Sequence, residues 1–406
     1  MKKITAMLLA VCLAVTMFGC GSSGSDNTTG STAESTTPTT KPVTFKSYTV
    51  SDEAAAAARS TVIATVNGNE LTNGVLNVCY WMGVYSFLNN YGSYASLYGL
   101  DYTQPLDKQG PATTDGSWQE FFIEDALLTW HRNQAVALAG EKLDVQMPDD
   151  MKNDLDSMLD QLRDAAEENG FESADAMFQK EFGMGCTIDD YYGYQRNYYQ
   201  YVAVMLYLDD TIEVTQEDID KYFAENEDDL AKSKITKDSG NVFDVRHILI
   251  SPEGGTKDDS GKTTYSEAEW EACRKKAQKL MDEWAGGTAT EETFSNYAKE
   301  YSTDPGSKDD GGLYQDLNKD TSFVEPFKNW YLEEGRKVGD YGLVKTDYGY
   351  HIMYMSDIEA QWISYCRSAI IDDTVNKFID DAKKEFPMES DQNKIMLGEV
   401  TLVSNK

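Results

Sequence analysis

Two short runs of apolar residues stand out along the chain, and each contains one histidine. Residues Val242–Ile250 and Gly349–Met355 are rich in β-branched and aromatic side chains, a pattern typical of buried strands. The first run contains His247 and the second His351, out of 3 histidines in the whole chain. Strands distant in sequence can pair at the centre of a small sheet, so we expect the two imidazoles to lie within reach of each other. The alternative, that each histidine only fills the core, stays open at this point.

Helical spacing dominates the rest of the pattern. Leucine and methionine recur along 151–166, and tyrosines recur on one side of 191–208. Such stripes are most often core, but this many aromatic residues could also line a groove for unfolded chains. Capping boxes at Thr215 and Ser266 predict two further helix starts, and the run 395–403 predicts a strand.

The first residues of the chain predict export. Met1-Lys2-Lys3 is followed by the apolar run 4–18, which is shorter than the about 20 residues that span a bilayer. Gly19-Cys20 then resembles a lipoprotein cleavage site, which predicts that 1–19 is a signal peptide and that Cys20 is lipid-modified. The following stretch to residue 50 begins with Gly, Ser, Thr and Asn, a composition typical of a disordered tether. Plain secretion is the alternative.

Composition excludes several classes of function. The net charge of −33 argues against nucleic acid as a partner and against direct adsorption to anionic lipid. No P-loop, nucleophile elbow or dinucleotide fingerprint is present, so no cofactor is expected. The calcium-like start at Asp316 lacks the required glycine and glutamate, so no metal is expected. The four cysteines beyond Cys20 have no metal-ligand spacing and predict free thiols; they are Cys79, Cys186, Cys273 and Cys366.

The segment that contains both histidines is made of five short motifs. They are Val245–Ile250, Phe294–Lys308, Gly311–Leu313, Phe323–Phe327 and Lys345–Ile352. In this order the motifs resemble the parvulin-type peptidyl-prolyl isomerases. Three departures from the usual pattern are visible: Leu313-Tyr314 replaces Leu-Gly, Phe323 replaces a common Met, and Tyr348 replaces the Phe before Gly-Tyr-His. These departures bear on substrate preference more than on activity.

This resemblance implies a site and a reaction. Rotation about a bond to proline is slow because amide resonance is lost at the halfway point, and its catalysis needs neither nucleophile nor cofactor. By the resemblance, His247, Asp304 and His351 form the polar cluster, with the imidazoles hydrogen-bonded to each other and Asp304 near the substrate carbonyl. The residues that the resemblance assigns to the apolar slot for the proline ring are Leu313, Phe323, Phe327 and Tyr348.

A second resemblance concerns the rest of the chain. The pattern Ala64–Thr72 is similar to the opening of the chaperone domain in extracytoplasmic foldases of the PrsA and SurA type. The implied fold class is α+β: a mostly helical chaperone body with an inserted parvulin-like domain, whose small antiparallel sheet is flanked by helices. We expect the strand 395–403 to pair with 62–66. The expected domains are a body over 51–236, the isomerase domain over 237–358, and a C-terminal helix and strand over 359–406 that pack on the body.

These expectations combine into one hypothesis: a foldase, lipid-anchored at the extracytoplasmic face of a bacterial membrane, that isomerises bonds to proline in secreted polypeptides. Its partners would be unfolded or partly folded secreted chains, with a homodimer left open. The first alternative is a chaperone whose parvulin-like domain is inert. The second, a solute-binding lipoprotein, would require repeated strand–helix alternation in two lobes, and the sequence lacks it.

Overall fold

The structure is a computed structural model that describes residues 52–101, 104–111, 115–183, 186–257, 263–398 and 400. These residues divide into two compact units. Unit 1 takes its residues from Met1–Ile212 and Asp373–Lys406, and unit 2 is Glu213–Asp372. The predicted signal peptide, Cys20 and the tether up to residue 50 lie outside the described residues. Within the described part, no helix has the length and apolar character needed to cross a membrane.

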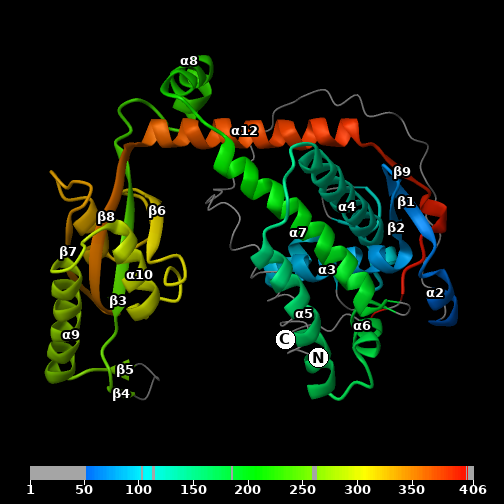
Figure 1. Cartoon of the computed structure of the whole chain (residues 1–406), viewed down its shortest axis with the longest axis horizontal. Coiled ribbons are helices and arrows are strands. Elements are labelled where there is room, and N and C mark those ends of the chain that lie inside the picture. Colours follow the sequence, from blue (N-terminus) through cyan, green and yellow to red (C-terminus); the bar gives the residue numbers. More distant parts are fainter. Residues whose placement is uncertain are drawn as a thin grey trace. The chain divides into compact units, whose positions relative to one another are not determined.

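Unit 1 contains a three-stranded antiparallel sheet in the order β2-β1-β9 (Figure 1). A tight turn at Asn67-Gly68 joins the first two strands, and both of its residues have positive φ, at 49° and 84°. Turns of this kind favour Asn-Gly because both positions need a left-handed backbone. Thr72 then caps the next helix by accepting a hydrogen bond from the Val75 backbone. The strands are β1 (Val62–Val66), β2 (Asn69–Thr72) and β9 (Met388–Ser390).

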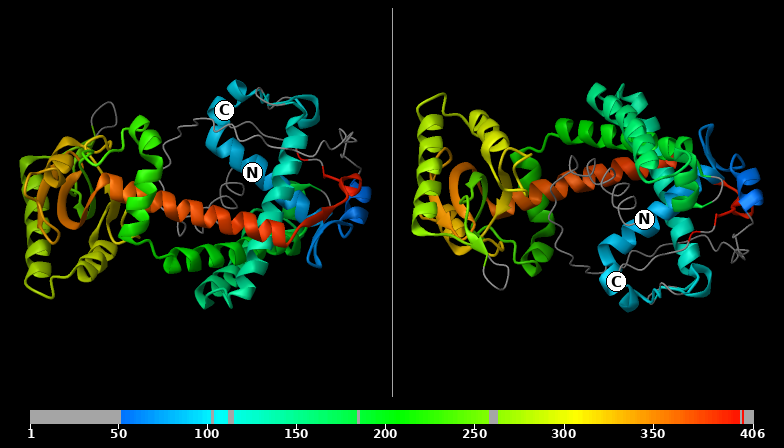
Figure 2. Two further views of the ribbon diagram at one scale, coloured as in Figure 1. Left: turned by 90° about the horizontal axis from the view of Figure 1, so that it is seen from above. Right: turned by 90° about the horizontal axis from the view of Figure 1, so that it is seen from below.

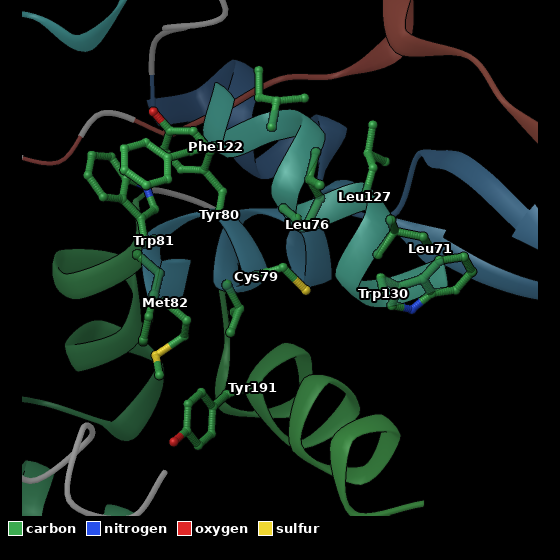
Figure 3. Close-up of a cluster of buried hydrophobic side chains, with 14 of the residues drawn as sticks. Leu71, Leu76, Cys79, Tyr80, Trp81, Met82, Phe122, Leu127, Trp130 and Tyr191 are labelled. Atoms are coloured by element: carbon green, nitrogen blue, oxygen red, sulfur yellow. The ribbon is translucent and has the colours of Figure 1, made fainter. Parts of the chain in front are cut away.

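Helices make up most of unit 1, and their apolar sides meet in one core (Figure 3). Phe122 and Tyr191, from two different helices, are each at most 2% exposed. The tyrosines predicted to lie on one helix side are therefore partly core. The helices are α2 (Asp52–Ala58), α3 (Asn73–Tyr91), α4 (Trp118–Lys142), α5 (Asp149–Glu168), α6 (Ala174–Phe182) and α7 (Ile188–Thr211), with short 3-10 turns at Gly92–Tyr98, Leu106–Lys108 and Gln392–Lys394.

The C-terminal strand is not where the sequence predicted it. Residues 388–390 pair with β1, with Ala64 opposite Ser390. The described residues of the predicted strand 395–403 form no strand, although Ile395 and Leu397 are buried in the core of unit 1. The prediction was wrong because Ile395 and Leu397, two residues apart and both buried, produce the same alternating pattern as a half-buried strand. Residues 399 and 401–403 lie outside the described residues.

Unit 2 is built on a four-stranded antiparallel sheet in the order β6-β3-β8-β7. The two histidine-containing runs are the central strands, β3 (Asn241–Ile250) and β8 (Gly349–Ala360). Their predicted pairing is therefore confirmed, as is the α+β class. The other elements are α8 (Gln216–Lys232), β4 (Thr256–Lys257), β5 (Thr263–Thr264), α9 (Glu267–Ala285), α10 (Glu291–Tyr301), β6 (Leu313–Leu317), α11 (Glu325–Tyr331) and β7 (Tyr341–Thr346).

The sheet of unit 2 separates two apolar clusters. Ile248 and Ile352 point to one face, where they pack with residues of α9 and α10. Val245 and Met353 point to the other face, where they pack with Phe327 and Tyr331 of α11. Alternation of side chains along a strand produces this division. Residues of two helices thus pack on one face, and residues of a single short helix pack on the other.

The unit boundaries differ from the predicted domains. Helix α8, expected in the N-terminal body, belongs to unit 2, because its Ile219 and Phe223 pack with Trp362 and Cys366. The long helix α12 (Gln361–Glu385), drawn in orange and red in Figure 2, contains the second boundary. All four described cysteines are free and buried.

Candidate active site

The strand register brings the two histidines to one face of the sheet. His247 lies opposite Met353, and His351 lies opposite Leu249, so the histidines are diagonal neighbours on paired antiparallel strands. Such neighbours lie roughly 7–8 Å apart, within reach of two ring side chains. Their Nδ1 atoms are 3.0 Å apart, and their ring planes are inclined by 24°. Both residues are at most 5% exposed.

The outer nitrogen of each histidine has its own partner. His351 Nε2 lies 2.8 Å from the hydroxyl of Thr346, which accepts a hydrogen bond from the Tyr348 backbone N–H. His247 Nε2 lies 3.2 Å from Asp304 Oδ2 and 3.1 Å from Ser307 Oγ. The result is a continuous hydrogen-bonded chain that starts at the β7–β8 turn, crosses both histidines and ends at a carboxylate.

Asp304 is held by the loop that follows α10. The loop is attached to β3, because Thr303 N–H donates to the Leu249 carbonyl at 2.9 Å and Leu249 N–H donates to Ser302 Oγ at 3.1 Å. Ser302 Oγ also accepts from the Asp304 backbone N–H at 3.2 Å. This anchoring fixes the position of the carboxyl group relative to the strand that carries His247.

One oxygen of Asp304 receives every hydrogen bond to its carboxyl group in the described structure. Oδ2 accepts from Ser307 Oγ at 2.6 Å and from Tyr314 Oη at 3.0 Å, in addition to the His247 ring nitrogen. The His247 hydrogen bond, followed by the one from Ser307, holds the pKa of Asp304 well below its usual range. Asp304 is therefore a carboxylate, and its second oxygen, Oδ1, is not engaged by any described residue.

The charge of Asp304 fixes the proton at its own end of the chain. A carboxylate only accepts, so a proton lies on His247 Nε2. The Nδ1 atoms of the two imidazoles face each other, and His351 Nε2 faces the Thr346 hydroxyl, so each ring nitrogen has a hydrogen-bond partner. Burial, followed by the neighbouring His247, lowers the pKa of His351 to about 3, which keeps His351 neutral.

Aromatic rings border the polar chain. Phe327 of α11 lies edge-on to both imidazoles, with ring centres 5.3 Å from His247 and 5.5 Å from His351, and it is 1% exposed. Phe323 stacks on Phe327 with ring centres 4.8 Å apart and is half-buried. Phe327 thus packs against both imidazoles in the core, whereas the side chain of Phe323 remains partly accessible.

Two of the predicted slot residues are not brought to these rings. Leu313 lies opposite Arg246 in the sheet, and the next residue, Tyr314, lies opposite Val245 on the face of His247. Because side chains alternate along a strand, Leu313 points to the opposite face. Tyr348 lies at the β7–β8 turn with 63% of its surface exposed, and its backbone N–H contacts the site where a ring contact was predicted.

Three polar residues of the site received no role from sequence reasoning. Ser307 and Thr346 lie in motifs that match the parvulin pattern, but hydroxyl residues are too common in loops and strand ends to be selected by type. Tyr314 was visible as a departure from the expected Leu-Gly, and that departure was the available signal. No group of His, Cys, Asp and Glu residues in the described part of the chain could hold a metal ion.

Unit 2 is similar in sequence to a known family of domains, and the chain is similar to known foldases. The family of PPIC-type PPIase domains matches residues 229–359. The foldase protein PrsA of Clostridium botulinum (strain Hall) is 31% identical over 147 residues, which are 35% of this chain and 33% of that protein. The chain thus matches about a third of that relative's length. The foldase protein PrsA of Clostridium kluyveri (strain ATCC 8527) is 27% identical over 317 residues, 73% of this chain and 75% of that one.

Among solved structures, PrsA from Bacillus subtilis is similar with 20% sequence identity and a TM-score of 0.33, covering 80% of this chain and 91% of that one. The matched segment runs from before β3 to the penultimate residue of β8 and so includes both strands that carry the histidine pair. Residues 229–359 thus match the PPIC-type PPIase domain family, in a chain that is similar to the PrsA foldases of two Clostridium species.

Proposed function

We propose that unit 2 catalyses cis/trans isomerisation of peptide bonds that precede proline. The observation that carries this proposal is the buried chain Thr346–His351–His247–Asp304, which ends in a carboxylate beside half-buried aromatic rings. Such a site has no nucleophile and needs none, because no covalent bond is broken in the reaction. The proline ring packs against Phe323, and the preceding carbonyl lies near Asp304.

The chemistry follows from amide resonance. A planar amide places partial negative charge on its oxygen, and this charge decreases when the bond twists, at a barrier of about 18–20 kcal/mol. A carboxylate held near that oxygen disfavours the planar form more than the twisted form. Only such differential stabilisation accelerates the reaction. The histidines act by fixing the carboxylate, because His247 is hydrogen-bonded to Asp304 and His351 holds His247.

Asp304→Asn tests the proposal, because it removes the charge and keeps the size of the side chain. We expect catalysed isomerisation of a proline-containing tetrapeptide by the full chain to fall by at least about tenfold, which is ~1.4 kcal/mol of transition-state binding. Asp309→Asn is the matched control, since it makes the same change at an exposed position of the same loop. Wild-type protein without activity would favour the alternative of an inert binding module.

We also propose that the chain acts as a foldase on secreted polypeptides at the outer face of a bacterial membrane, anchored through Cys20. The export-like N-terminus and the PrsA relatives support this location. If the anchor is correct, Cys20→Ala releases the protein from the membrane fraction on cell fractionation. Continued membrane association of that variant would contradict it.

An exposed aromatic cluster in unit 1 supports the binding of unfolded clients. Tyr94 is 61% exposed and Leu97 75%, and Tyr91 and Tyr98 lie edge-on to each other with ring centres 5.5 Å apart. Tyrosine offers apolar area with a polar edge, which suits unfolded chains of varied sequence. Replacing Tyr94 and Leu97 by Ser should weaken suppression of client aggregation without changing proline isomerisation.

A further inference from the structure

Tyr314 joins the polar part of the site to its apolar part. Its hydroxyl donates to Asp304 Oδ2 at 3.0 Å. Its ring lies over His247, with ring centres 5.4 Å apart and planes inclined by 27°, and it meets Phe323 edge-on at 4.9 Å. The side chain comes from β6, on the same sheet face as His247, and it is half-buried. Part of the Tyr314 side chain therefore remains accessible.

The backbone opposite Tyr314 is shaped to admit its hydroxyl. A Cβ atom added at Gly306 would lie 2.6 Å from Tyr314 Oη, and the φ of Gly306 lies outside the left-handed region that favours glycine. Glycine at this position is therefore explained by space and not by backbone conformation. The phenol thus has a dedicated place between β6 and the loop that carries Asp304.

We propose that Tyr314 is a positioning residue for Asp304 and, through its ring, a wall of the proline-binding site. The proposal rests on the isomerase function proposed above. Its hydroxyl is one of three donors that converge on Asp304 Oδ2, so it fixes the rotation of the carboxylate and leaves Oδ1 for the substrate. Its ring, together with Phe323, occupies the place that sequence reasoning assigned to Leu313.

The hydroxyl and the ring have separate kinetic consequences. Tyr314→Phe keeps the ring and loses the donor, so it should lower kcat about tenfold with KM within twofold of wild type. Tyr314→Ala also loses the wall, so it should raise KM about tenfold in addition. The measurement is isomerisation of a proline tetrapeptide by the full chain. Tyr341→Phe, which removes a hydroxyl from a 46% exposed ring on β7, is the matched control and should match wild type.

Gly306→Ala gives an independent test of the same contact. In the wild-type background the new methyl group displaces the phenol, so kcat should fall by about the same factor as in Tyr314→Phe. In the Tyr314→Phe background the clashing oxygen is absent, and Gly306→Ala should change kcat by less than twofold. A merely structural role for Gly306 would make the two effects multiply.

The experiments distinguish failure of the role of Tyr314 from failure of the proposed isomerase function. Activity of wild-type protein together with unchanged kcat in Tyr314→Phe, or multiplicative effects in the double variant, would overturn the role of Tyr314 alone. Wild-type isomerase activity in the Asp304→Asn variant would overturn the proposed function. Thermal unfolding of each variant is measured alongside, and a variant that is unfolded at the assay temperature is assayed again below its unfolding transition.

Discussion

At the residue scale, the site depends on two groups whose ionisation is set by burial and hydrogen bonding. Asp304 is kept ionised because its Oδ2 accepts from three donors. Burial and the Asp304 carboxylate raise the pKa of Tyr314 to about 12, so its hydroxyl stays a donor. His351 is kept neutral by burial, which lowers its pKa to about 3. The Asp304 carboxylate thus lies near a protonated phenol and a neutral imidazole, and the proposed mechanism requires that carboxylate.

The low pKa of His351 predicts acid lability of unit 2. An unfolded His351 binds a proton below pH 6.5, whereas the folded one stays neutral down to about pH 3. Its contribution to stability is therefore present above pH 6.5 and is lost as the pH falls through this window, with a slope of up to about 1.4 kcal/mol per pH unit. Asp304, whose pKa is also lowered, adds the same sign of dependence, but only below its ordinary value of 3.8.

His351→Gln checks this prediction. We expect the free energy of unfolding of the variant to fall less steeply than that of wild type as the pH is lowered from 6.5 to 4.5. The difference in slope should approach that for one proton, about 1.4 kcal/mol per pH unit, whatever the stability at neutral pH. Denaturant unfolding at several pH values measures the slope directly. An unchanged slope would mean that His351 does not stay neutral in the folded protein.

The sequence could predict part of the site and not all of it. His247 and His351 could be found because histidine is rare in this chain and each lies in a strand pattern. Ser307 and Thr346 could not, because their roles depend on loop and turn geometry that places a hydroxyl within 3.1 Å of a ring nitrogen. Leu313 was assigned to the slot by the resemblance alone, and the register that pairs it with Arg246, on the other face of the sheet, cannot be read from the sequence.

At the element scale, two asparagines of α3 replace a missing strand partner. Asn73 donates to the Lys394 carbonyl and accepts from Met396 N–H, while Asn77 donates to the Met396 carbonyl and accepts from Gly398 N–H. Residues four apart on a helix are roughly 6 Å apart, close to the roughly 6.7 Å between alternate residues of an extended chain. Alternate backbone groups of the segment are therefore paired with asparagine side chains of a helix and not with a strand, which apolar patterning cannot reveal.

Close backbone approach in unit 2 gives a prediction about glycine. Gly312 has φ +77°, and an added Cβ would lie 2.2 Å from the His247 carbonyl oxygen, whereas Gly339 has φ +88° with no atom within 4 Å. Both positions strain an alanine, at roughly 1 kcal/mol. Only Gly312→Ala also forces β3 and the site loop apart, so it should destabilise unit 2 by at least about 2 kcal/mol more than Gly339→Ala. Denaturant unfolding of both variants measures the difference, and equal losses would contradict the close approach.

At the scale of the whole chain, the order of the units was partly visible in the sequence. The run of parvulin motifs marked the central segment, and the helix and strand after it had no partner nearby in sequence. The placement of α8 was not visible, because its Ile219 and Phe223 have the spacing of any amphipathic helix. Only the structure shows that the matching apolar residues are Trp362 and Cys366 of unit 2.

The discontinuous composition of unit 1 gives the last prediction. Truncation after Asp391 removes Ile395 and Leu397, each 2% exposed, and the hydrogen bonds that Asn73 and Asn77 make to the backbone of this segment. Burying one such side chain contributes ~1.5–3 kcal/mol, so unit 1 should lose at least about 3 kcal/mol. Unit 2 contains none of these residues, so proline isomerisation should remain at the wild-type level.

Differential scanning calorimetry with a parallel isomerase assay separates the two units. We expect the truncated chain to show an earlier transition for unit 1 and an unchanged one for unit 2. Met396→Ala in the full chain is the control, because that side chain is 37% exposed and lies between the two buried ones. If the truncated chain unfolds like the full one, the C-terminal segment does not complete unit 1. If isomerisation is lost together with unit 1, the two units do not fold independently, and the site requires the helical unit for its own stability.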